Sequence, residues 1–209
     1  LGMATACRPQ LAFAAPFFVD AASFFVAAAL VASIPGRFRA ERDPDAPRAP
    51  FRSELAEGVR WLMRHPLLRP MAIILGLMNL AGTVTGATLV LFAQEVLDIG
   101  PLLFSILGFG AAAGGIVGGT VAPWASKRFG SGTCLAVVLG GSALLSVAVG
   151  ILPFWPVVMI VFGLEVLLGT LWNVITVSLR QTIIPSQLLG RVNSVYRFFA
   201  WGMMPIGAA

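Results

Sequence analysis

The fold is decided by residues 157–180, which read VVMIVFGLEVLLGTLWNVITVSLR and hold one carboxylate, Glu165, among apolar side chains. An apolar run of this length predicts a helix that spans the hydrocarbon core of a bilayer, about 30 Å thick. A charged side chain inside such a helix costs on the order of 2.5–3.5 kcal/mol. Glu165 therefore needs a partner, a proton or a water-filled cavity, which makes it a candidate functional residue.

The same pattern recurs along the chain, and it predicts an all-α integral membrane protein. Of the 209 residues, 58% are hydrophobic and only 11% are charged, against roughly 25% charged in soluble domains. The apolar stretches are residues 11–34, 70–93, 102–126, 134–152, 157–179 and 194–209. The last is too short to cross the bilayer as a helix, and the first residues lack the features of a signal peptide. We therefore expect a fragment of a longer protein.

Positive charge alternates between the connections. Basic side chains concentrate in every second connection and its flanks, at residues 35–69, Lys127, Arg128, Arg180, Arg191 and Arg197. The intervening connections carry only Glu95 and Asp98, or no charge. Because cytoplasmic loops are enriched in lysine and arginine, the odd-numbered connections are expected to be cytoplasmic.

The first connection contains a candidate amphipathic helix at about residues 51–65. Leu55, Val59 and Leu62 recur at i, i+4 and i+7, which places them on one face. Two interpretations remain open for this face. It lies in the membrane interface, or it docks on another domain.

Polar residues follow one face of the helix that contains Glu165. Glu165, Gly169, Asn173, Thr176 and Arg180 share a stripe at helical spacing, with Trp172 at its margin. A shorter stripe is formed in the second stretch by Asn79, Thr83 and Gly86. Such faces suit a cavity that hydrates or binds a solute, while hydrogen bonding between helices remains the alternative.

Other intramembrane features favour structural roles. Asp20 lies near the outer third of the first apolar stretch, where a backbone or hydroxyl partner could hold it. Gly110, Gly114 and Gly118 have the GxxxG spacing that brings two membrane helices close together.

A faint internal repeat links two of the predicted helices. GLMNLAGT, residues 76–83, and GLEVLLGT, residues 163–170, share five identities. The two helices run in opposite directions, so the similarity is of the kind that inverted transporter repeats leave. Chance remains an alternative, because glycine, leucine and threonine are common in such helices.

Several classes of function lack support in the sequence. The basic residues fall in short blocks between apolar runs, which argues against nucleic-acid binding. Cys7 and Cys134 are far apart and His65 is the only histidine, so no metal site and no cofactor are indicated. No nucleotide-binding or hydrolase motif occurs, so we do not expect an enzyme.

Three segments resemble transporters of the major facilitator superfamily. RQTIIPSQLLGRVNSVYRFFAWGMMPIG, residues 180–207, resembles the connection between spans ten and eleven. PFFVDAASFFVAAAL, residues 16–30, resembles span six, and EGVRWLMRHPLLRPM, residues 57–71, resembles the central loop. The branch that they resemble most holds siderophore exporters of the enterobactin type and macrolide or multidrug efflux proteins.

The resemblance implies a twelve-helix fold in two halves that works by alternating access. Residues 1–34 would end the N-terminal half, residues 35–69 would form the cytoplasmic central loop, and residues 70–209 would form spans seven to eleven, the last incomplete. The missing N-terminal half would then be a partner within the same polypeptide, in a bacterial-type inner (plasma) membrane.

The resemblance also implies a proton-coupled antiporter that exports amphipathic or hydrophobic small molecules, drug-like or siderophore-like. The substrate and proton pathway is expected to include Glu165, Asn79, Thr83, Trp172, Asn173 and Thr176. Structural or gating roles are expected for Asp20, Arg128, Gly130, Arg180, Gly190, Arg191 and Arg197.

One motif departs from the family pattern. In PWASKRFGSGT, residues 123–133, Lys127 stands where the family has an acid, while Arg128 and Gly130 match. A carboxylate latch at this position is therefore in doubt. The alternative to a transporter is a membrane scaffold or assembly subunit, in which the glycine ridges and the amphipathic helix would bind other subunits.

Overall fold

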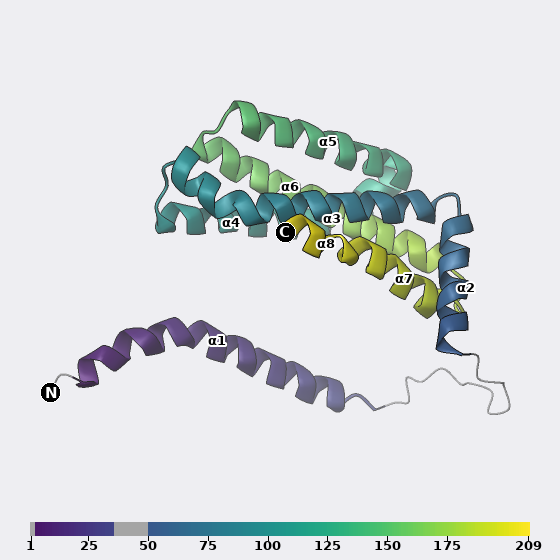
Figure 1. The fold of residues 1–209 in the computed structure, drawn as a ribbon, viewed down its shortest axis with the longest axis horizontal. Helices are drawn as coiled ribbons and strands as arrows, with labels where there is room; N and C mark the ends of the chain where they lie inside the picture. Colours follow the sequence, from purple (N-terminus) through teal and green to yellow (C-terminus); the bar gives the residue numbers. More distant parts are fainter. Residues whose placement is uncertain (1–2, 36–49) are drawn as a thin grey trace. The chain divides into compact units, whose positions relative to one another are not determined.

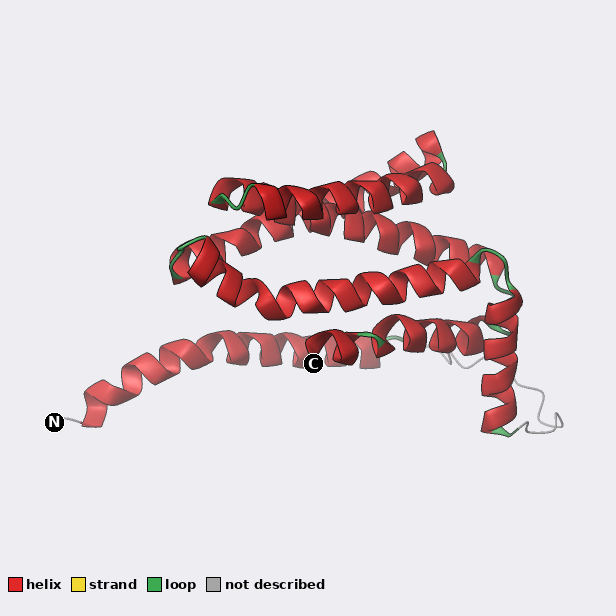
Figure 2. Ribbon diagram, turned by 45° about the horizontal axis from the view of Figure 1, so that its top comes forward, coloured by secondary structure: helices red, strands yellow, loops and turns green. Residues whose placement is uncertain are grey.

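A computed structural model describes residues 3–35 and 50–209, and helices are the only regular secondary structure in those residues (Figure 2). The chain divides into two compact units, Leu1–Arg48 and Ala49–Ala209. The first unit contributes α1 (Met3–Ala32). The second contains α2 (Phe51–Arg64), α3 (Leu68–Leu91), the π-helical turn η1 (Phe92–Val96), α4 (Pro101–Phe129), α5 (Ser131–Ile151), α6 (Trp155–Ile183), α7 (Leu189–Gly202) and α8 (Met204–Ala208).

Five of the described helices are long and apolar enough to cross a membrane. They are Ala14–Ala32 within α1, Leu68–Val96, Pro101–Phe129, Ser131–Ile151 and Trp155–Ile183. This confirms the prediction of an all-α, multi-pass membrane protein. The last apolar stretch, residues 194–209, is divided between α7 and α8. Pro205 stands in the first turn of α8, where its missing N–H breaks no helical hydrogen bond.

Short connections make successive helices antiparallel. The four long helices α3, α4, α5 and α6 lie along one direction, and α2 stands across their ends (Figure 1). Gly130 alone joins α4 to α5, and its φ of 81° is a left-handed conformation that favours glycine. Because the helices alternate in direction, the start of α7 and the ends of α4 and α6 all lie at the α2 end.

The backbones of α4 and α6 approach each other through glycines. A Cβ on Gly110 would lie 2.9 Å from the carbonyl oxygen of Met159, and a Cβ on Gly118 would lie 2.7 Å from that of Leu167. Between them, a Cβ on Gly114 would overlap the carbonyl group of Gly163. Only glycine permits this spacing, because a Cβ would collide with the backbone of α6. The close backbone approach gives the two membrane helices their dispersion contacts.

The crossing of α3 with α7 repeats that of α6 with α4. A Cβ on Gly163 of α6 would lie 2.9 Å from the carbonyl oxygen of Gly110, and a Cβ on Gly76 of α3 would lie 3.2 Å from that of Phe199. Gly76 and Gly163 are the first residues of the two sequence repeats. The repeat in the sequence therefore coincides with a repeat in packing.

The far end of each repeat shows the same correspondence. A Cβ on Gly118 would lie 2.9 Å from the Cβ of Thr170, and a Cβ on Gly207 of α8 would lie 3.2 Å from the Cβ of Thr83. Thr83 and Thr170 are the last residues of the two repeats. Equivalent positions thus contact equivalent partners, as two inverted copies of one helical unit would.

The apolar face of α2 packs on the bundle. Leu62 is fully buried in a cluster that includes Leu68 of α3 and Val192 and Tyr196 of α7. Leu55, one turn before the packed part of α2, keeps 45% of its surface exposed. Of the two interpretations drawn from the sequence, docking on protein applies at Leu62. The helix docks on its own bundle and not on another domain. The spacing of apolar residues in α2 predicted an apolar face but could not predict what covers that face.

Candidate functional site

A pocket of about 390 Å³ lies between α3, α6 and α7. Amide, aromatic and basic side chains form most of its wall, and no acidic residue is among them in the described part of the chain. The lining residues are Leu75, Asn79, Asn173, Val177, Arg180, Gln181, Leu189, Asn193, Tyr196, Arg197, Ala200 and Trp201. A partly polar pocket of this size has the dimensions of a small-molecule site.

Asn79 joins α3 to α7 at the edge of the pocket. Its side-chain N–H donates to the backbone carbonyl of Ala200 at 2.7 Å. Ala200 lies in the last turn of α7, where carbonyl groups lack helical partners. The Thr83 hydroxyl donates in turn to the backbone carbonyl of Asn79 at 2.7 Å. Asn79 thus satisfies a helix end and lines the pocket, while Thr83 lies against α8.

Arg180 is held deep in the pocket wall. Only 8% of its surface is exposed. Its Nε donates to the backbone carbonyl of Thr176 at 3.3 Å, and its guanidinium carbon lies 4.1 Å from the ring centre of Tyr196. The Tyr196 hydroxyl donates to the carbonyl of Met71 at 3.3 Å, which fixes the ring against α3. Arg180 is therefore positioned by an aromatic face and a carbonyl group.

Arg197 lies on the same helix as Tyr196 and also stacks on an aromatic side chain. Its guanidinium carbon lies 4.2 Å from the ring centre of Trp201. Among the described residues, neither Arg180 nor Arg197 has a carboxylate within ion-pair distance. The pocket therefore carries positive charge that the described part of the protein does not neutralise.

The stripe predicted on α6 is divided between different surroundings. Asn173 and Arg180 line the pocket with Asn79. Thr176 is buried, and its hydroxyl is 3.3 Å from the carbonyl of Asn173. Trp172, 2% exposed, packs in an apolar cluster with Ala122 and Val138, and its indole N–H has no partner in the described residues.

Glu165 does not line the pocket. Its carboxylate lies against α5, where one oxygen accepts a hydrogen bond from the Ser142 hydroxyl at 2.8 Å. The other oxygen, Oε1, is buried and has no partner in the described part of the chain. A sequence signal for Ser142 exists, because it is a polar residue beside two glycines in an apolar helix. The polar stripe on α6 did not indicate that Glu165 faces α5 and not the pocket.

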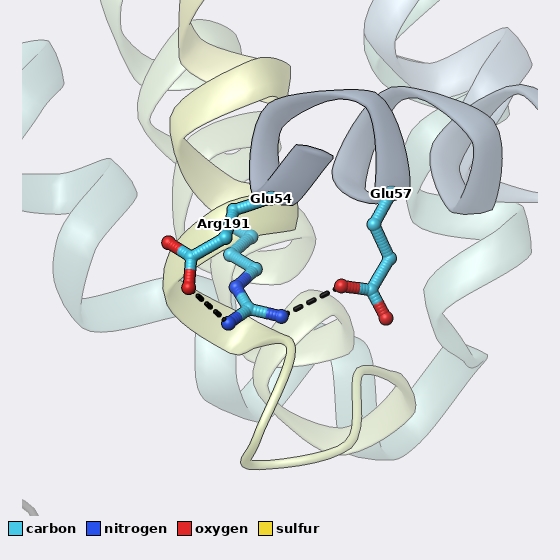
Figure 3. A network of polar contacts seen from close by, with 3 residues as sticks. All are labelled: Glu54, Glu57 and Arg191. Carbon is cyan, nitrogen blue, oxygen red and sulfur yellow. Dashed lines mark hydrogen bonds and ion pairs between the residues drawn. The ribbon is translucent and has the colours of Figure 1, made fainter. Parts of the chain in front are cut away.

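The remaining predicted residues of the second unit lie at helix ends. Arg191 lies at the start of α7, after Gly190, and forms ion pairs of 2.6 Å with both Glu54 and Glu57 of α2 (Figure 3). These pairs attach α2 to α7. Lys127 and Arg128 occupy the last turn of α4, where cations complement the helix dipole.

Asp20 lies on α1, in the N-terminal unit. Its backbone carbonyl accepts a hydrogen bond from the Ser23 hydroxyl at 2.7 Å.

Four polar or aromatic pocket residues were not among the sequence candidates: Gln181, Asn193, Tyr196 and Trp201. A signal was present for two of them, because Asn193, Arg197 and Trp201 recur at i, i+4 and i+8.

Comparison with known proteins identifies one family. A family model described as Major Facilitator Superfamily matches residues 5–208, which is nearly the whole chain. No curated protein and no solved structure matches the chain.

Proposed function

Because the chain belongs to the Major Facilitator Superfamily, we propose that it is part of a proton-coupled exporter of amphipathic or hydrophobic small molecules that works by alternating access. Family membership makes it a membrane transporter with a partial fold of that superfamily. The proposal adds the direction, the coupling ion and the class of solute, either drug-like or siderophore-like.

The observation that carries the proposal is the polar pocket between α3, α6 and α7. Asn79, Asn173 and Trp201 offer hydrogen bonds and an aromatic face to a solute, in a bundle whose long helices expose many large apolar side chains. The pocket lies toward the α2 end, where the basic connections gather. By the positive-inside rule this end is cytoplasmic, so a solute would enter the pocket from the cytoplasm.

Glu165 is the group proposed to carry the coupling proton. It lies in the first half of α6. Its only partner in the described residues is the Ser142 hydroxyl, and no cation contacts it there. Along α6 it is eight residues from Asn173, a rise of about 12 Å. Proton and solute would thus occupy separate places on one helix, and movement of α6 would affect both.

The scaffold alternative loses support at both of the features on which it rested. It required the glycine ridge of α4 to bind another subunit, but Gly110, Gly114 and Gly118 contact α6 of the same chain. The apolar face of α2 is likewise occupied, at Leu62, by the bundle.

The test uses the full-length protein in inverted membrane vesicles with an imposed pH gradient, read by a quenched pH-sensitive dye. Glu165→Gln removes the proposed proton carrier. Glu95→Gln is the matched control, since it removes the same charge from an exposed position beyond α3. We expect amphipathic solutes to discharge the gradient through wild type and Glu95→Gln but not through Glu165→Gln.

Two results would contradict the proposal. Equal discharge by Glu165→Gln and wild type would remove Glu165 from the proton path. Solute exchange across the membrane without any movement of protons would refute proton coupling, while leaving the protein a transporter.

A further inference from the structure

We propose that the pocket between α3, α6 and α7 binds an oxyanion, such as a carboxylate, carried by an apolar or aromatic solute, with Arg180 as its main ligand. This inference rests on the proposed transport function and specifies the solute. A glutamate in the pocket would favour a cationic solute. Here the pocket should favour an anionic one, because Glu165 faces α5 and the arginines face the pocket.

The first step concerns the unused donors of Arg180. A guanidinium group has five N–H donors, and the structure assigns an acceptor only to Nε, the carbonyl of Thr176. The donors on the two terminal nitrogens have no protein acceptor among the described residues, and Arg180 lines the pocket. A planar guanidinium with free terminal donors matches the two oxygens of a carboxylate.

The second step concerns burial. Arg180 is 8% exposed, and a buried charge without a counter-ion is strongly unfavourable. Tyr196 contributes the face of its ring at 4.1 Å, which attracts a cation but does not neutralise it. An anion in the pocket would supply the missing counter-charge at a place where water competes little.

The third step concerns the rest of the wall. Arg197, stacked on Trp201 and exposed, adds a second positive charge on the α7 side of the pocket. Asn173 and Asn193 provide neutral donors, while Leu75 and Val177 provide apolar surface for the body of the solute. With no carboxylate among these residues, an organic cation would meet repulsion without compensation.

The experiment measures binding to the purified full-length protein, so it needs no pH gradient and is independent of proton coupling. The probes are naphthalene-2-carboxylate and its uncharged amide, which share one aromatic body. Isothermal titration calorimetry gives the Kd of each probe, and a thermal-shift assay gives the change in unfolding midpoint on binding. Both are recorded for wild type, Arg180→Gln, Arg180→Lys and Arg197→Gln. Arg60→Gln on α2 is the control, because it removes an exposed arginine outside the pocket.

We expect wild type and Arg60→Gln to bind the carboxylate at least tenfold more tightly than the amide. Arg180→Gln should abolish this preference, and Arg197→Gln should reduce it. Arg180→Lys should retain part of it, because lysine keeps the charge but lacks the paired donors of a guanidinium group. If Arg180→Gln does not fold, the preference of wild type and the effect of Arg180→Lys still decide the matter.

Four outcomes overturn the inference. Wild type that binds carboxylate and amide equally, or neither, has no oxyanion site. A carboxylate preference that persists in Arg180→Gln places the site elsewhere. Carboxylate binding that is displaced by phosphatidylglycerol but not by phosphatidylcholine assigns the pocket to a lipid headgroup instead of a solute. Finally, wild type could fail to bind the carboxylate while Arg180→Gln lowers thermal stability. This result would indicate that Arg180 has a counter-ion from elsewhere in the polypeptide.

Discussion

Replacing Gly114 by alanine tests the closest approach between helices in the bundle. The new Cβ would overlap the carbonyl oxygen of Gly163 and would lie 2.7 Å from its carbonyl carbon and 3.1 Å from its Cα. All these atoms belong to the backbone, so no side chain can turn away. Ordinary contact begins near 3.4 Å. The carbonyl carbon alone therefore requires α4 and α6 to separate by about 0.7 Å, and the overlapping oxygen requires more, so at least a quarter to a half of each affected dispersion contact is lost.

The expected loss of stability follows from this separation. Overpacking of this kind costs about 1–3 kcal/mol. In a chain of 150–250 residues each 1 kcal/mol shifts the unfolding midpoint by roughly 2–4 °C, so we expect Gly114→Ala to lower the midpoint by roughly 2–12 °C. Gly108→Ala is the matched control on the same helix, because a Cβ there would have no atom within 4 Å.

A buried thiol provides the assay. Cys134 is 5% exposed and packs against Ala125 of α4 and Ile175 of α6, so a thiol-reactive fluorescent dye labels it only when the helices separate. The purified protein, carrying Cys7→Ser, is heated with the dye. If Gly114→Ala is labelled at the same temperature as Gly108→Ala, the close contact between α4 and α6 does not exist and the reasoning fails.

Two further predictions concern α2. Leu62→Ala should destabilise the protein by about 2–5 kcal/mol, because it opens a cavity in a fully buried cluster, whereas Leu55→Ala, 45% exposed, should stay within about 0.5 kcal/mol; equal midpoints for the two variants would show that α2 does not pack as described. Arg191→Ala removes two partly exposed ion pairs, with Glu54 and Glu57, each worth about 0.2–1 kcal/mol, and should speed hydrogen exchange in α2. The acceleration should vanish at high salt, where such pairs are screened, and an effect that is independent of salt would rule out an electrostatic attachment.

The helices themselves could be predicted from the sequence because a membrane helix is a local structure. Each apolar stretch must satisfy its own backbone hydrogen bonds in lipid, and this requires a helix whatever its neighbours are. The glycine spacing on α4 and the repeat of residues 76–83 and 163–170 were equally visible, since both depend on position along the chain. Composition could not locate Met203, where the last apolar stretch divides into α7 and α8, or the π-helical turn Phe92–Val96.

The composition of the pocket could be predicted only in part. Asn79, Asn173 and Arg180 were recognised as polar residues on predicted helices, and the structure brings them to one pocket. Periodicity alone could not reveal that α7 completes this pocket with Tyr196 and Arg197, because that depends on how α7 crosses α3.

The sequence by itself determined that this protein is a bundle of membrane helices with its basic residues at alternate connections. These are properties of single segments, set by hydrophobicity and by the charge of each loop. Tertiary structure alone decided that Glu165 faces Ser142 on α5 while Asn173, on the same stripe, faces the pocket. A helical stripe is wide enough to meet two neighbours, and the glycine contact of Gly114 with Gly163, which sets how α6 lies against α4, contributes to deciding which residue meets which.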